Sequence, residues 1–353
     1  MKLRAAFLLG LALVGFAAPA AAKRLVIIDQ DGRGPGTSDQ TSMLMLLQAP
    51  DVEVLGITIV SGDQWRDEEV AHTLRMLELT GHAGVKVYPG AIFPLINSRE
   101  EIARWEKLYG KVYYQGAWND PGRTGKYRVP YHDPYVVPAL PEGSPALRPE
   151  AEDAAHFLIR MLHRHPHAVT VYAAGPLTDL AQVVSLDPGA PELAEQLVVM
   201  GGSIGPANPS WHTANRREFN FWWDPEAVHI ALRAPWPRIT LTTVDISVQT
   251  RFTQALIDEI GRSPRPTAQY VARYADEEFL WDELAAAAWL DPRVVTASES
   301  LYLDIDTSHT AGYGNTLVWR PGDQPGLGER LVTVQTAVDL PRLDALLVSL
   351  LSR

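Results

Sequence analysis

The stretch Leu25-Val26-Ile27-Ile28-Asp29-Gln30-Asp31-Gly32, followed by Ser38-Asp39-Gln40, decides the fold. Its first four residues form a continuous apolar run rich in β-branched side chains, which is typical of a strand buried on both faces of a parallel sheet. The acids follow directly after this run. Because ligands of open parallel α/β sheets bind beyond the carboxyl ends of the strands, this stretch predicts a buried strand with a polar site at its end.

Strands and helices alternate along the rest of the chain. Further strands are expected at 52–60, 85–88, 168–173, 197–199, 239–242 and 301–305, and helices at 41–48, 68–79, 151–164, 177–184, 225–232 and within 252–290. This alternation predicts an α/β fold: a single domain with a mostly parallel central sheet flanked by helices, and an active site at the carboxyl ends of the strands. Residues 97–148, rich in Pro, Gly, Trp and Tyr, break the pattern, and we interpret them as a lid or binding loop or as an element that the pattern hides.

The first 22 residues have the order of a secretory signal peptide. Lys2 and Arg4 precede an apolar run at 7–16 and the small residues Ala20-Ala21-Ala22. We therefore expect a signal peptide at 1–22, a mature domain at 23–353, and export to the periplasm or out of the cell. The alternative is a buried N-terminal helix. The apolar run is too short for a confident membrane span, and the chain has no cysteine that could carry a lipid anchor or form a disulfide.

Composition limits the class of partner. With 46% hydrophobic and 21% charged residues in a chain of 353, a large core is expected and global disorder is excluded. A formal net charge of −11 argues against a nucleic-acid backbone as partner, because no basic excess exists to displace its counterions. A neutral nucleoside or sugar stays compatible with this charge.

Three carboxylates, those of Asp29, Asp31 and Asp39, lie within eleven residues of one another. At one end of a sheet they would repel strongly unless a cation neutralised them. Oxygen ligands without cysteine or paired histidines favour a hard ion, Ca²⁺ or Mg²⁺, over zinc. The alternative interpretation is that Ser38 or Asp39 caps a helix and that the other acids are solvated.

Six short motifs, spread in order along nearly the whole mature chain, resemble those of the inosine-uridine-preferring nucleoside hydrolases. That family opens on a strand followed by D-x-D-P-G-x-D-D-A, which residues 29–32 and 38–40 resemble across a longer loop. The remaining matches are 56–63 to G-I-T-x-V-x-G-N, 87–91 to V-Y-x-G-A, 174–179 to G-P-L-T-N, 200–202 with 218–220 and 224–227 to M-G-G…E-F-N…D-P-E-A, and 281–285 to H-D-x-x-A.

The resemblance implies a Ca²⁺ site and a reaction. Asp31, Asp39, Asp282 and the backbone carbonyl of Ala174 would coordinate Ca²⁺, with Asp29 supporting this shell and the ribose 2′- and 3′-hydroxyls completing it. A metal-bound water, deprotonated by Asp31, would attack C1′ as the bond to the base breaks. Carboxylates near an oxocarbenium-like state stabilise it electrostatically, and a cation orients the diol and acidifies the water.

The resemblance also implies that Glu218 and Asn220 bind ribose hydroxyls, although these two residues could instead be a helix cap and a surface acid. A substrate-binding asparagine is expected in the loop before Glu218, where Asn208 and Asn215 both stand. Asp63 replaces an expected asparagine and would add a charge or a different substrate contact.

Two further departures affect substrate binding. Ser38 stands where the family usually has an acid that contacts the ribose, and its hydroxyl would bind more weakly than a charged acceptor. Trp281 stands where many members have a histidine that protonates the leaving base, and tryptophan cannot do so. Trp281 would stack on the base or belong to the core.

The loop between Asp31 and Asp39 is also longer than in the family, with Gly34, Pro35, Gly36 and Thr37 as the extra residues.

The group that protonates the leaving base stays unassigned. His132 and His212 lie in loop-like stretches and are candidates, and Tyr113, Tyr114 and Trp118 could close over the base.

These residues predict a Ca²⁺-dependent hydrolase that releases base and ribose from a nucleoside, with self-association into a dimer or tetramer expected from the resemblance. One alternative keeps the ribosyl chemistry but acts on another N-ribosylated small molecule, such as nicotinamide riboside. A second alternative is an exported ribonucleoside-binding protein without turnover. Retention of Asp31, Asp39 and Asp282 argues against the latter.

Overall fold

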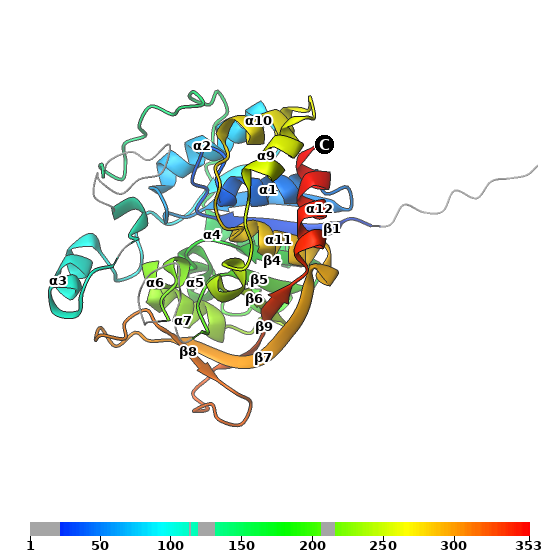
Figure 1. Ribbon diagram of the computed structural model, residues 1–353. Coiled ribbons are helices and arrows are strands. Elements are labelled where there is room, and N and C mark those ends of the chain that lie inside the picture. The colour runs from blue at the N-terminus through cyan, green and yellow to red at the C-terminus, as the bar shows by residue number, and fades with distance from the viewer. Residues whose placement is uncertain (1–21, 113, 119–130, 206–215) are drawn as a thin grey trace, which may run out of the picture.

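The computed structural model describes residues 22–112, 114–118, 131–205 and 216–353 (Figure 1). Its centre is a nine-stranded sheet in the order β3-β2-β1-β4-β5-β6-β9-β7-β8. The strands are β1 (Arg24–Gln30), β2 (Val52–Ile59), β3 (Val87–Pro89), β4 (Val169–Ala173), β5 (Gln196–Met200), β6 (Ile239–Thr242), β7 (Val295–Ile305), β8 (Thr316–Trp319) and β9 (Arg330–Val338). Neighbours from β3 through β9 pair in parallel, whereas β7 pairs antiparallel with both β9 and β8.

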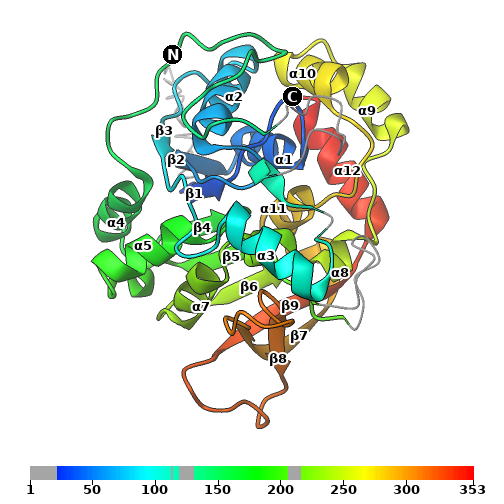
Figure 2. The same ribbon diagram turned by 90° about the vertical axis from the view of Figure 1, so that its left-hand side faces the viewer.

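Helices cover both faces of the sheet (Figure 2). One layer contains α1 (Ser38–Gln48), α2 (Arg66–Leu79), α9 (Gln254–Gly261), α10 (Pro266–Tyr274), α11 (Asp282–Leu290) and α12 (Leu340–Leu351). The opposite layer contains α4 (Ala154–Arg164), α5 (Thr178–Leu186) and α7 (Pro225–Arg233). The short helices α6 (Phe219–Trp223) and α8 (Val244–Ser247) follow the carboxyl ends of β5 and β6, and α3 (Arg99–Tyr109) projects from the body (Figure 1).

The apolar run of β1 is buried on both faces, as its composition predicts. Val26 and Ile28 pack into the core beneath α1 and α11, whereas Ile27 packs into the core beneath α4 and α5. Successive side chains of a strand point to opposite faces, so one strand contributes to both cores. The predicted α/β architecture with a mostly parallel sheet is confirmed.

Several predicted boundaries differ from the structure. Residues 97–148 are not wholly irregular, because α3 and the 3-10 turn Gly116–Trp118 lie within them. Ser98 caps α3 by accepting a hydrogen bond from the Glu101 amide, a local signal that the aromatic and glycine content of this stretch obscured. The predicted helical region 252–290 is three helices, since the break at Pro264 and the extended segment before α11 interrupt it.

The carboxyl-terminal strands β8 and β9 and helix α12 were not predicted. β9 extends the parallel part of the sheet next to β6, β8 pairs antiparallel with β7 at the edge, and α12 completes the layer around α1. None of the helices in the described residues is long and apolar enough to cross a membrane.

An aromatic cluster supports the segments that lie over the carboxyl ends of the strands. Trp118 stacks on Trp223 at a ring distance of 3.9 Å, and Trp65 and Phe219 pack edge-on or tilted against the same indole. Trp118 is therefore part of a buried cluster and does not line the site described below.

Candidate active site

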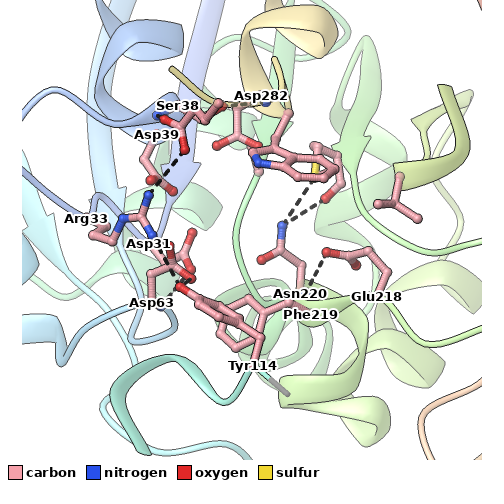
Figure 3. A pocket seen from close by; sticks show the side chains of 15 residues that line it. Asp31, Arg33, Ser38, Asp39, Asp63, Tyr114, Glu218, Phe219, Asn220 and Asp282 are labelled. Carbon is pink, nitrogen blue, oxygen red and sulfur yellow. Dashed lines mark hydrogen bonds and ion pairs between the residues drawn. The ribbon is translucent and has the colours of Figure 1, made fainter. Parts of the chain in front are cut away.

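A cavity of about 220 Å³ lies at the carboxyl ends of the parallel strands (Figure 3). Segments that follow β1, β2, β4, β5 and β6 all contribute to its wall, as expected for an open α/β sheet. Six carboxylates line it: those of Asp31, Asp39, Asp63, Glu218, Glu278 and Asp282. Arg33 is the one cationic side chain among the described residues of the lining.

Asp31 directly follows β1 and is almost fully buried. Its Oδ2 accepts a hydrogen bond of 2.9 Å from the Asp63 amide, and its own amide donates to Gln30 Oε1 at 2.9 Å. Burial, followed by repulsion from Asp39 and Asp63, raises the pKa of Asp31 well above its ordinary value. A buried, fixed carboxylate with a raised pKa is suited to accept a proton.

Gly62 allows the β2 segment to approach Asp31 closely. A Cβ at this position would lie 2.1 Å from Asp31 Oδ2, far inside van der Waals contact. Only glycine fits at position 62 without moving the Asp31 carboxylate. The neighbouring Asp63 amide can therefore reach that carboxylate and donate to it.

Asp39 and Asp282 come from the first turns of α1 and α11, which pack against each other. Burial, followed by repulsion from Asp63, raises the pKa of Asp39 to about 7. Burial, followed by repulsion from Asp39, raises the pKa of Asp282 well above its ordinary value. Gln30 Nε2 donates to Asp282 Oδ2 at 3.0 Å and holds it at the cavity.

Asp31, Asp39 and Asp282 thus converge from three segments on one cavity, which Ala174 also lines. Within the described residues, no group of three or more His, Cys, Asp or Glu side chains is drawn together tightly enough to hold a metal ion. The three carboxylates instead repel one another in a buried space, and such an excess of negative charge favours a bound cation.

Asp29 is not brought to this cavity. Its Oδ1 accepts a hydrogen bond of 2.6 Å from the Thr58 hydroxyl, and it lies beside the buried carboxyl of Asp179. Strand alternation would place residues 29 and 31 on the same face, but Asp31 lies just beyond the end of β1, where this alternation no longer fixes the direction of a side chain. Asp29 contacts the site only through its carbonyl, which accepts from the Ala174 amide at 2.9 Å.

Ser38 lines the cavity, but its hydroxyl is committed to other groups. Its Oγ donates to Glu283 Oε2 at 2.5 Å and accepts from the Asp282 amide at 3.0 Å. Neither Ser38 nor Asp39 caps α1, because Thr37 is the N-cap residue and makes no side-chain cap. The capping interpretation of these two residues is therefore wrong.

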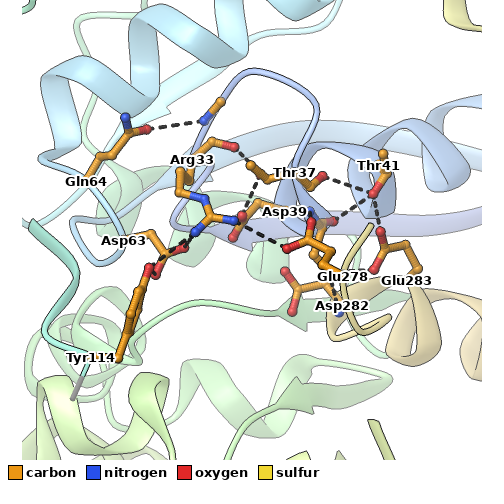
Figure 4. Close-up of polar contacts among 12 residues, drawn as sticks. Arg33, Thr37, Asp39, Thr41, Asp63, Gln64, Tyr114, Glu278, Asp282 and Glu283 are labelled. Atoms are coloured by element: carbon orange, nitrogen blue, oxygen red, sulfur yellow. Dashed lines mark hydrogen bonds and ion pairs between the residues drawn. The ribbon is translucent and has the colours of Figure 1, made fainter. Parts of the chain in front are cut away.

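The longer loop after Asp31 places Arg33 in the wall (Figure 4). Its Nη1 lies 3.0 Å from Asp63 Oδ2 and its Nη2 lies 3.5 Å from Glu278 Oε2. The Tyr114 hydroxyl accepts from Arg33 at 3.3 Å and donates to Asp63 Oδ1 at 2.5 Å. Gly36, at φ +74°, lets the loop turn against Tyr274, where a Cβ would lie 2.6 Å from the Tyr274 carbonyl carbon.

Sequence reasoning missed Arg33 and Glu278. Arg33 was visible as the only basic residue in the glycine-rich loop between Asp31 and Asp39. Glu278 had no such signal, because it lies in the extended segment between α10 and α11 and reaches the cavity only through tertiary packing.

Glu218 and Asn220 lie on the opposite wall (Figure 3). Glu218 caps α6 by accepting from the amides of Asn220 and Phe221, and it also accepts from Gly202 at 2.8 Å. Burial raises the pKa of Glu218 to about 7. The capping interpretation of Glu218 is correct, the surface-acid interpretation is wrong, and the residue lines the cavity as well.

Trp281 stands immediately before α11, is partly buried, and lines the cavity. Its ring packs at 5.0 Å against Phe279, so it is neither fully in the core nor free. Tyr114, whose ring meets Phe219 edge-on at 4.8 Å, lines the cavity too. The cavity lining therefore includes three aromatic side chains, those of Tyr114, Phe219 and Trp281.

His132 is not part of the cavity lining. Its Nε2 instead lies 2.9 Å from Oε2 of Glu68, a buried residue of α2. Asn208, His212, Asn215 and Tyr113 lie outside the described residues.

Comparison with known proteins finds similarity along most of the chain. Residues 26–345 match the family described as inosine-uridine preferring nucleoside hydrolase. Uncharacterized protein C800.11 of Schizosaccharomyces pombe is 28% identical over 91% of this chain and 82% of its own length. The pyrimidine-specific ribonucleoside hydrolase RihA of Shewanella baltica is 28% identical over 84% of this chain and 87% of its own length.

A solved structure has the same fold. The purine-preferring ribonucleoside hydrolase from Gardnerella vaginalis superposes with a TM-score of 0.72 at 20% identity, covering 93% of this chain and 98% of that one.

Proposed function

The chain belongs to the inosine-uridine preferring nucleoside hydrolase family, an N-glycosyl hydrolase family, and from this premise we propose that it is a Ca²⁺-dependent hydrolase of ribonucleosides. The observation that carries the proposal is the convergence of Asp31, Asp39 and Asp282 on one buried cavity at the carboxyl ends of the strands. These buried carboxylates repel one another, and a bound divalent cation would neutralise that repulsion.

The donor set fits Ca²⁺. Carboxylate oxygens from three segments and a backbone carbonyl at Ala174 are hard ligands, and the described lining holds no cysteine or histidine that would favour zinc. When bound, Ca²⁺ would orient the ribose diol and lower the pKa of a water. Asp31, Asp39, Asp282 and Ala174 would hold it.

In the proposed reaction, water adds to C1′ as the C1′–N bond breaks, and the bond electrons leave with the base. Asp31 accepts the proton of the attacking water, and the Asp63 amide keeps the Asp31 carboxylate in place. The surrounding carboxylates stabilise the positive charge that develops on the ribosyl ring. Glu218 and Asn220 lie across the cavity and bind ribose hydroxyls.

Trp281 supports a second candidate substrate class. It cannot protonate a departing base, but its ring can stack on one. An N-ribosylated pyridinium, such as nicotinamide riboside, leaves as a neutral molecule and needs no proton. The described lining contains no histidine, which favours this alternative for the same ribosyl chemistry.

The proposal is tested by incubating the purified protein with Ca²⁺ and a panel of inosine, uridine, adenosine, cytidine and nicotinamide riboside, with free reducing sugar as the readout. Release that stops on chelation and in Asp31→Ala supports hydrolysis. Tight binding of these compounds with no sugar released from any of them would contradict it.

We also propose that the protein is exported and self-associates. Cleavage before Lys23 is expected from the small residues at 20–22. Intact mass of the protein recovered from a periplasmic extract tests the cleavage site, and light scattering tests the assembly.

A further inference from the structure

We propose that Glu278 is a specificity-determining residue that binds a ribose hydroxyl, in place of a side chain at the start of α1; the inference rests on the proposed hydrolysis of ribonucleosides. Glu278 belongs to none of the motifs described above and comes from the extended segment between α10 and α11.

The amino-terminal turn of α1 has no free side-chain acceptor of its own at position 38. The Ser38 hydroxyl gives its proton to Glu283 and accepts from the Asp282 amide. Ser38 is also only 3% exposed. Asp39 in the same turn is assigned to the cation, so a substrate hydroxyl that approaches residue 38 needs an acceptor from another segment.

Glu278 supplies a carboxylate at that place. Its Oε1 accepts from the Ser38 amide at 2.9 Å, so the acid sits on the first residue of α1 while its own side chain stays 22% exposed and lines the cavity. Asp39 and Asp282, the neighbours of this position, line the same cavity. Glu278 is thus next to the carboxylates that would organise the ribose diol.

Two contacts fix the carboxylate before substrate arrives. Arg33 Nη2 lies 3.5 Å from Oε2, and the Ser38 amide donates to Oε1 at 2.9 Å. The backbone of Glu278 is held separately, because its carbonyl accepts from the Phe252 amide at 2.7 Å. A positioned acceptor loses little conformational freedom on binding, and a hydrogen bond to a charged acceptor is stronger than one to a neutral hydroxyl. The longer loop after Asp31 brings in Arg33 and so completes this arrangement.

The experiment compares Glu278→Gln with the wild-type protein on inosine, 2′-deoxyinosine and 3′-deoxyinosine, as substrates or as competitive inhibitors. For inosine, kcat/KM is expected to fall by about 10- to 100-fold, the effect of losing a hydrogen bond to a charged acceptor. For the deoxy form that lacks the bound hydroxyl, the effect is expected to shrink to about twofold or less, since the interacting group is already gone.

Controls separate this role from a structural one. Ser38→Ala is expected to affect all three sugars equally, because its hydroxyl holds Glu283 and α11. Glu277→Gln changes the neighbouring acid, which is exposed and outside the cavity lining, and is expected to leave activity unchanged. Ca²⁺ affinity, measured by titration calorimetry with CaCl₂, is expected to fall by no more than about fivefold in Glu278→Gln, the through-space effect of one charge that is not a ligand.

An equal loss on all three sugars would overturn the proposal, because Glu278 would then be a structural residue. A loss of Ca²⁺ affinity well beyond about fivefold would also overturn it, because Glu278 would then be a metal ligand. A wild-type protein that releases no sugar would contradict the proposed function instead. In that case the dissociation constants of the three compounds are compared between Glu278→Gln and the wild-type protein. They can be measured at equilibrium because no compound is hydrolysed. A loss of affinity that depends on the sugar hydroxyl still identifies Glu278 as its acceptor.

Discussion

Arg33 Nη1 lies 3.0 Å from Asp63 Oδ2, and this ion pair joins the loop after β1 to the loop after β2 across the wall of the cavity. The Tyr114 hydroxyl bonds to both partners, and Glu278 lies on the far side of the guanidinium. The pair therefore ties together four segments that are distant in sequence.

Removal of the guanidinium is expected to destabilise the protein. In Arg33→Met, Asp63 and Glu278 lose their partner in a mostly buried wall, which costs about 2–4 kcal/mol of unfolding free energy. Urea unfolding of Arg33→Met and of the wild-type protein measures this difference in unfolding free energy. Arg33→Met combined with Asp63→Asn should recover at least about 1 kcal/mol relative to the sum of the single changes, because the two residues interact directly.

The matched control is Arg104→Met, whose side chain is 69% exposed in its pair with Glu101. Its loss is expected to cost about 0–1 kcal/mol. Equal effects of the two arginine variants would show that the Arg33 pair is no stronger than an ordinary surface contact.

Loss of a carboxylate from the proposed Ca²⁺ site should lower activity, as removal of Ca²⁺ should. Asp282→Asn retains the shape of the side chain but removes a charge from the buried cluster, so Ca²⁺ affinity is expected to fall by at least about tenfold. Asp31→Asn removes the proton acceptor as well, and kcat is expected to fall by about 10²- to 10⁴-fold. Calorimetric titration with CaCl₂ and the reducing-sugar assay measure the two effects, with Asp258→Asn, on the exposed side of α9, as control.

Gly62→Ala should damage catalysis more than stability. The added methyl group would meet Asp31 Oδ2 at 2.1 Å and force the carboxylate away from the Asp63 amide. We expect kcat to fall by at least about tenfold, since small displacements of a catalytic group carry large penalties. Gly84→Ala, where nothing lies within 4 Å of the added atom, is the control. An unchanged kcat in Gly62→Ala would show that Asp31 tolerates displacement.

Trp281→Ala is expected to weaken substrate binding. If the ring stacks on the base, its loss costs about 1–3 kcal/mol, or roughly a 5- to 150-fold rise in KM. The effect should be absent for ribose alone as a competitive inhibitor, because ribose has no base. An equal loss of affinity for ribose would contradict the stacking role and indicate that Trp281 shapes the ribose end of the cavity.

The buried cluster of Glu68, His72 and Glu142 should make the free energy of unfolding depend on pH. Burial by itself would lower the pKa of His72, but Glu142 and Glu68 outweigh it, so the pKa is raised above 6.5. Burial by itself would raise the pKa of Glu68, but His132 and His72 outweigh it and lower its pKa below 4.5.

The stabilisation from His72 is therefore fully present below pH 6.5 and is lost as the pH rises through the raised pKa. That from Glu68 is present above pH 4.5 and is lost in more acidic solution. Urea unfolding at pH 5.5, 7 and 8.5 should show the wild-type protein losing stability relative to His72→Gln as the pH rises. His156→Gln, an exposed histidine, should keep the wild-type slope.

The local sequence determined the central strand of the sheet and the end of the sheet at which the site lies. The apolar run of β1 had to be buried on both faces, and the acids directly after it had to lie at the sheet edge, because strand periodicity and chain direction are properties of the residues themselves. Asp31, Asp39, Asp63 and Ala174 could be predicted for one site in the same way, because they follow predicted strands. Glu218, Asn220, Trp281 and Asp282 were predicted for it only by their resemblance to the motifs of the family.

Tertiary structure alone decided which of these side chains face the cavity and which partners they have. Asp29 stands two residues from Asp31 but turns to Thr58, and Ser38 turns to Glu283. Glu278 and Arg33 reach the site from an extended segment and a longer loop, where no period fixes the direction of a side chain. Their positions depend on contacts between residues that are far apart in sequence, and such contacts exist only once the chain has folded.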